Sequence, residues 1–163
     1  MWLLLGTRSR HKEEYASAYT FKNTLPRFPG VQTKDAIPLF TDLRIVKSAY
    51  EIKQLRRAID ITCEAHLNVM TKVAQHIRPG LNESDLDGII LSTYRRRGAH
   101  WGFPPIVASG PNATTLHYEE KDREIMFEDE LVLLDIGAAV DHYSADITRT
   151  IPFSGTFTPE HRA

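Results

Sequence analysis

One stretch of the chain constrains its fold more than any other, the run LVLLDIGAAVDHYSADITRT over residues 131–150. Its first four residues are apolar enough to form a buried strand, yet that strand leads directly into Asp135. A second strand returns to meet Asp146. A turn centred on Val140 and Asp141 makes a hairpin in which the two aspartates face each other, with Cβ atoms about 5 Å apart. Val-Asp is not a favoured two-residue turn, so a wider loop with the same centre is also compatible with this pairing.

Two opposed carboxylates at the end of an apolar strand indicate a site for a cation. They repel each other and lose hydration, so either one of them holds a proton or a cation lies between them. A divalent metal with oxygen ligands satisfies both groups. On spacing alone, two ordinary surface aspartates beside a turn remain the alternative. Asp141 and His142, at the turn itself, are interpreted as solvated turn residues.

A second candidate segment, FPPIVASGPNATTLHY, covers residues 103–118. Its two prolines lead into a predicted strand at 106–108, and Gly-Pro-Asn makes a turn. A further predicted strand at 114–118 carries His117. A lone histidine is usually structural, and the chemical alternative is a proton shuttle or a donor to a developing oxyanion.

Two helices are predicted before these strands. Ser48 and Glu51 form a capping box, and an apolar stripe follows at helical spacing and ends at Arg-Pro-Gly: Ile52, Leu55, Ile59, Cys63, His66, Met70, Val73 and Ile77. His66 and Cys63 are therefore interpreted as buried structural residues. The second helix runs from an Asn82 cap to Gly98, with Glu83 and Asp85 complementing the dipole of its first turn. Two helices followed by strands at 106–108, 114–118, 130–138 and 143–151 predict an α+β fold.

The first 45 residues differ from the rest. A short strand at 2–5 and a helix at 12–18 are predicted, and prolines and a glycine then indicate an irregular connection: Pro26, Pro29, Gly30 and Pro38. These residues are too few to bury a core alone. We expect a remnant or linker over 1–45.

Composition excludes several classes of protein. The chain has 163 residues, and its 20 Lys and Arg nearly balance its 21 Asp and Glu, for a net charge of −1. This balance argues against a nucleic-acid binder and against a polybasic membrane patch. No apolar run approaches the ~18 residues of a membrane-spanning helix, and the opening MWLLL is too short for a signal peptide. With a single cysteine, Cys63, no intramolecular disulfide is expected, and a cytoplasmic location is predicted.

Taken together, these segments resemble a known family. From about residue 43 to 163, the runs EIKQLRRAIDIT, RPG, FPPIVASGPNATTLHY, LVLLDIGAAVDHYSADITRT and PFSGTFTPEHR occur in unbroken order. They resemble the pita-bread metallopeptidases and, within them, the aminopeptidase P (Xaa-Pro aminopeptidase) group. The Asp-x10-Asp element followed by ITRT carries most of this resemblance, together with the LHY element upstream.

The resemblance implies a fold, an activity and site residues. The fold is the first half of a pita-bread fold, two helices packed on a curved antiparallel sheet, over 46–163, with 1–45 as the remnant of an N-terminal domain and linker. The activity is metal-dependent release of an N-terminal residue that precedes proline, with two divalent metal ions, most often manganese. Asp135 chelates one metal and Asp146 bridges both. His117 contacts the substrate and stabilises the tetrahedral intermediate, and Phe103 stands at the substrate site where a tyrosine is often found.

The sequence also departs from the family. The remaining metal ligands, one His and two Glu, lie downstream of the ITRT strand in the family, and this chain stops at Ala163. We therefore expect an incomplete metal site, an isolated chain that is inactive, and an open sheet covered by self-association or by a missing second half. Two alternatives are a prolidase-type Xaa-Pro dipeptidase and a non-catalytic remnant that acts as a binding or assembly module.

Overall fold

The chain divides into two compact units, residues 1–48 and 49–163. The computed structural model describes residues 2–3, 20, 23, 30, 32, 34–75, 80–125 and 129–162. No helix in these described ranges is long and apolar enough to cross a membrane.

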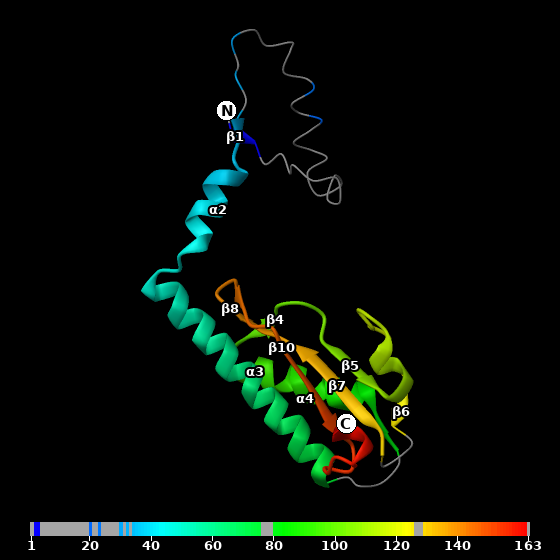
Figure 1. Cartoon of the computed structure of the whole chain (residues 1–163). Helices are drawn as coiled ribbons and strands as arrows, with labels where there is room; N and C mark the ends of the chain where they lie inside the picture. Colours follow the sequence, from blue (N-terminus) through cyan, green and yellow to red (C-terminus); the bar gives the residue numbers. More distant parts are fainter. Residues whose placement is uncertain are drawn as a thin grey trace. The chain divides into compact units, whose positions relative to one another are not determined.

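In the first unit, strand β1 (Trp2–Leu3) pairs in parallel with strand β2 (Lys34–Asp35), and helix α2 (Ile37–Ile45) follows (Figure 1). The expected irregular connection is wrong at residues 37–45. Pro38 lies in the first turn of α2, where its missing N–H leaves no helical hydrogen bond unmade. The helix expected at 12–18 lies outside the described residues, and the assignment of 1–45 as a domain remnant stays a prediction.

The second unit contains both predicted helices. Helix α3 (Ala49–Gln75) begins directly after Ser48, and helix α4 (Glu83–Arg96) begins directly after Asn82. The backbone N–H of Asn82 donates to the Asp85 carboxylate over 2.9 Å, which is half of a capping box. The predicted continuation of α3 to residue 77 lies outside the described residues.

The face that α3 buries is not the one that the sequence predicted. Its buried residues lie about a quarter of a turn from the predicted stripe at 100° per residue: Gln54, Ala58, Ile61, Thr62, Ala65, His66, Val69 and Val73. His66 is buried as predicted. Cys63 is exposed, so its assignment to the core is wrong, and Ile52 and Ile59 are exposed as well.

Three short sheets complete the second unit. In the first, strand β7 (Leu131–Ile136) lies between β10 (Ile147–Pro152) and β5 (Ile106–Ser109), all antiparallel (Figure 1). In the second, β8 (Ala138–Val140) lies between β4 (His100–Trp101) and β9 (Tyr143–Ser144). In the third, β3 (Leu81–Asn82) pairs with β6 (Glu124–Ile125). Strands β3, β4 and β6 were not predicted from the sequence.

Three of the predicted strands differ from the structure. The strand expected over 143–151 is interrupted at Ala145 and Asp146, between β9 and β10. The strand expected at 114–118 is absent from the described residues there: the 3-10 helix η3 (Gly110–Thr114), with Pro111 in its first turn, ends at Thr114, and a turn with left-handed backbone at His117 follows. The strand expected over 130–138 is interrupted at Gly137. A Cβ on Gly137 would lie 1.9 Å from the Ala145 carbonyl oxygen and 2.8 Å from the Phe103 ring, so only glycine fits at this position.

The hairpin has a different register from the predicted one. Val140 pairs with Tyr143, and Asp141 and His142 form the turn, with φ of +48° and +68°, as the tight primed turns of hairpins require. Asp135 is therefore paired with Thr148, and its predicted direct pairing with Asp146 is wrong by two residues. A shift of two residues keeps every side chain on its face of the sheet, so Asp146 stays on the face of Asp135 as a diagonal neighbour.

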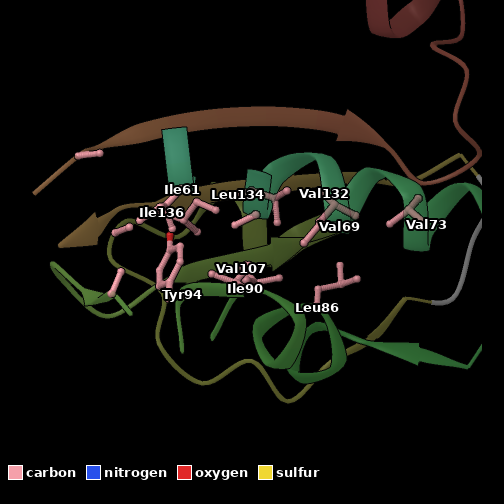
Figure 2. Packing of buried hydrophobic residues seen from close by; sticks show 14 of the residues in the cluster. Ile61, Val69, Val73, Leu86, Ile90, Tyr94, Val107, Val132, Leu134 and Ile136 are labelled. Carbon is pink, nitrogen blue, oxygen red and sulfur yellow. The ribbon is translucent and has the colours of Figure 1, made fainter. Parts of the chain in front are cut away.

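The core lies between the two helices and one face of the sheet. Even-numbered residues of β7 point into it, and the side chains of α3, α4 and β5 pack around them (Figure 2): Val132, Leu134, Ile136, Ile61, Val69, Val73, Leu86, Ile90, Tyr94 and Val107. The alternate residues of β7, which include Asp135, are half-buried on the opposite face. The unit is therefore an α+β structure of two layers, with Asp135 on the face of the sheet away from the helices.

Candidate functional site

A pocket of about 290 Å³ lies beside Asp135. All four residues that the sequence analysis selected line it, namely Phe103, His117, Asp135 and Asp146, together with Pro104, Ile106 and Glu119. These residues come from four separate segments: the loop before β5 with the first residue of that strand, the loop after η3, β7, and the residues between β9 and β10. The fold thus brings the selected residues together, and their individual roles stay predictions.

The two aspartates concentrate negative charge at this pocket. Asp135 is half-buried and accepts a hydrogen bond of 2.8 Å from the Thr148 hydroxyl. Loss of hydration, the charge of Asp135 and a hydrogen bond between the two carboxyl groups raise the pKa of Asp146. Neighbouring carboxyl groups that favour a proton in this way are also suited to a divalent cation with oxygen ligands. Among the described residues, no group of three or more His, Cys, Asp and Glu side chains is placed to hold a metal.

His117 reaches the pocket from an irregular segment. Its backbone is left-handed, with φ of +54°, a conformation that is uncommon for a residue with a side chain. The imidazole is exposed, as a group that contacts a bound molecule must be. The next residue but one, Glu119, is a third carboxylate in the pocket. It was not selected from the sequence, and the signal available was the acidic pair Glu119 and Glu120, which follows Tyr118.

Phe103, on the apolar side of the pocket, is held beside Gly137, the residue that separates β7 from β8. The backbone N–H of Gly102 donates to the Gly137 carbonyl over 2.8 Å. Phe103 follows directly, with its ring against Gly137. The close approach that excludes a side chain at Gly137 therefore also sets the position of Phe103 beside the two aspartates.

Glu83 has partners that were not predicted from the sequence. It was interpreted as a residue that complements the helix dipole in the first turn of α4, where it lies. In the structure its side chain is fully buried and is surrounded by hydrogen-bond donors from the chain on both sides of His117. Sequence periodicity cannot identify such a group, because its partners lie 26 to 40 residues away.

Comparisons of the sequence with known proteins agree on one group of metallopeptidases. Residues 53–163 match the model of metallopeptidase family M24. A probable Xaa-Pro aminopeptidase PEPP of Phaeosphaeria nodorum is 38% identical over 162 residues, covering 91% of this chain and 34% of that protein. The Xaa-Pro aminopeptidase of Escherichia coli is 42% identical over 126 residues, covering 77% of this chain and 27% of that protein.

Solved structures agree with the sequence matches. A variant of Escherichia coli aminopeptidase P, solved in complex with substrate, superposes with a TM-score of 0.76 at 34% sequence identity. The superposition covers 99% of this chain and 36% of that one. The chain therefore spans about a third of the length of the relatives that it matches.

Proposed function

Because the chain belongs to metallopeptidase family M24, we propose that it is part of an Xaa-Pro aminopeptidase, which releases the N-terminal residue of peptides with proline in second position. Its α+β fold is the portion of the aminopeptidase P pita-bread fold that this chain covers. The observation that carries the proposal is that His117, Asp135 and Asp146 line the same pocket.

Asp135 and Asp146 are the residues that would hold divalent metal, and manganese is the ion we propose. Their oxygen donors and their closely spaced carboxyl groups fit a hard divalent cation. When bound, such an ion polarises a substrate carbonyl and lowers the pKa of water. The Thr148 hydroxyl, which donates to Asp135, fixes the orientation of that carboxylate toward the pocket.

The other pocket residues would bind and orient the peptide. The exposed His117 imidazole can donate a hydrogen bond to the carbonyl oxygen on which negative charge develops. Phe103, Pro104 and Ile106 form an apolar surface against which a proline ring can pack. Glu119 adds a carboxylate that can pair with the free amino group of the substrate.

The test measures manganese uptake and peptide cleavage with the same protein. An Xaa-Pro-Xaa tripeptide and an Xaa-Pro dipeptide are incubated with the chain and Mn²⁺, alongside Asp135→Asn, Asp146→Asn and the matched turn variant Asp141→Asn. We expect Mn²⁺ uptake that both pocket variants lose and the turn variant keeps. Cleavage of the tripeptide supports the aminopeptidase, whereas cleavage of the dipeptide alone indicates the prolidase type.

The outcomes have distinct meanings. Uptake without cleavage supports the metal site and the expectation that the isolated chain is inactive. No uptake by the unmodified chain contradicts the metal assignment and favours a non-catalytic module. Self-association of the chain and a cytoplasmic location remain predictions from the sequence.

A further inference from the structure

The side chain of Glu83 occupies an unusual position for a charged residue at the start of a helix. It is fully buried, and a carboxylate removed from water is stable only when hydrogen-bond donors surround it. Its first oxygen accepts from the Ser109 backbone N–H over 2.6 Å and from the Ser109 hydroxyl over 2.8 Å. Its second oxygen accepts from the Tyr118 hydroxyl over 2.7 Å. The Asn112 amide lies within 3.3 Å and 3.4 Å of the two oxygens.

These donors come from both sides of the irregular segment that carries His117. Ser109 ends β5, and Tyr118 directly follows the histidine. Beyond it, the backbone of Arg123 is joined to that of Glu83 by an N–H···O=C bond of 3.0 Å. One carboxylate thus ties the beginning and the end of the segment to the first turn of α4.

The donors are in turn held by a connected network. The Tyr118 hydroxyl accepts from the Asn112 amide over 2.8 Å while it donates to Glu83. The Ser109 hydroxyl accepts from the Arg123 guanidinium over 2.8 Å, and Arg123 also donates to Glu130 over 2.7 Å. Each donor and acceptor named in this network has a partner, and a satisfied buried network of this kind makes a local structure unique and rigid.

We propose that Glu83 is a positioning residue for His117, holding the left-handed backbone of the histidine so that its imidazole lies at the pocket of Asp135 and Asp146. The side chain of Tyr118 is 5% exposed and directly adjoins His117, so the bond from its hydroxyl to Glu83 leaves the histidine little freedom to turn away. The proposal rests on the function proposed above for the role of His117, but its structural part can be tested separately.

The test compares Tyr118→Phe with Tyr143→Phe by NMR on the full chain. The first variant removes the hydroxyl that donates to Glu83, and the second removes a hydroxyl that donates to Glu51 over 3.2 Å, away from the segment. Backbone chemical shifts of His117 report its φ, and selective broadening of its imidazole signal by added Mn²⁺ reports its distance from the metal. Amide exchange in β7 reports whether the fold is retained.

We expect Tyr118→Phe to shift the His117 backbone signals and to lose the selective broadening, with protected β7 amides and unchanged Mn²⁺ uptake. Tyr143→Phe should match the unmodified chain. Glu83→Gln places an amide N–H₂ group, itself a donor, among the donors that surround the carboxylate. This variant should lose the selective broadening of the His117 imidazole signal more completely than Tyr118→Phe. Unchanged His117 signals in a folded Tyr118→Phe chain overturn the proposal. If the unmodified chain shows no selective broadening, the metal assignment fails, and the backbone shifts alone decide the role of Glu83.

Discussion

At the scale of single residues, the pocket depends on a position that admits no side chain at all. Gly137 separates β7 from β8, and the Ala145 carbonyl and the Phe103 ring occupy the space where a Cβ would lie. The sequence shows this glycine only as one letter after Asp135 and Ile136. Its importance comes from a close approach of two backbone segments that residue patterns do not reveal.

We predict that Gly137→Ala destabilises the chain strongly. The Cβ would overlap backbone at 1.9 Å, and backbone cannot move aside as a flexible side chain can, so the loss should reach or exceed the ~1–3 kcal/mol typical of overpacking. Gly88→Ala is the matched control, because Gly88 is exposed in α4 with nothing within 4 Å of its Cβ position. That change should stabilise the helix by about 0.5–1 kcal/mol. Denaturant unfolding of both variants tests these two predictions. Equal free energies of unfolding for the two variants would contradict them.

At the scale of elements, α3 is joined to the sheet at the interruption beneath the two aspartates. The Thr62 hydroxyl accepts from the Ala138 backbone N–H over 2.9 Å and donates to the Ala58 carbonyl over 2.8 Å. One turn later, the His66 ring contacts the Ile147 carbonyl over 3.1 Å. The helix therefore supports β8 and β10 where each strand begins, just beside Asp135 and Asp146.

We predict that Thr62→Val lowers the free energy of unfolding by about 1–3 kcal/mol, because the buried Ala138 N–H loses its acceptor. Thr71→Val is the control: its hydroxyl donates to the Leu67 carbonyl in the same helix, but the residue is exposed. Its stability should change by no more than about 0.5 kcal/mol. Urea titration of the two variants measures the difference, and comparable losses would argue against the special role of Thr62.

The second prediction at this scale concerns pH. Burial lowers the pKa of His66 from its usual value of 6.5, so the unfolded chain binds this proton more readily than the folded one. The contribution of His66 to stability is therefore complete above pH 6.5 and declines as the pH falls below that value. His66→Gln should lack this decline. The test is the stability difference between the two proteins from about pH 8 to about pH 5, and a constant difference would refute it.

The helices and strands show which features a sequence can predict. The starts of α3 and α4 were predicted because Ser48 and Asn82 are residue types that favour helix caps, and the effect of a cap is local. The buried face of α3 was not, because the prediction followed large side chains such as Ile52 and Ile59. The interface instead uses Ala58 and Ala65, whose small size lets the neighbouring elements approach closely.

The same distinction applies to the candidate site. His117, Asp135 and Asp146 were selected because acidic and imidazole groups are recognisable next to apolar strands. The two-residue error in register came from the turn, whose left-handed residues Asp141 and His142 do not form a common turn dipeptide. The prediction that Asp135 and Asp146 lie close together did not depend on that error, because a shift of two residues keeps each side chain on the same face of the sheet.

At the scale of the whole molecule, three large apolar side chains of α3 remain exposed. Ile52, Ile59 and Leu67 are 42%, 42% and 62% exposed and lie along one side of the helix. Exposed apolar stripes of this kind favour association. We predict that the molar mass from light scattering rises with protein concentration, and that Ile59→Lys with Leu67→Lys suppresses the rise. Ser92→Lys, at an exposed position of α4, should leave it in place, and a constant monomer mass at all concentrations would contradict the prediction.

The burial of Glu83 has a consequence for the order in which this molecule can assemble. The chain from 109 to 123 both covers this carboxylate and supplies its donors. A closed segment without these hydrogen bonds would leave a buried charge unpaired, which is strongly unfavourable. Closure of the segment and formation of its bonds to Glu83 are therefore coupled, and the position of His117 is set in the same event.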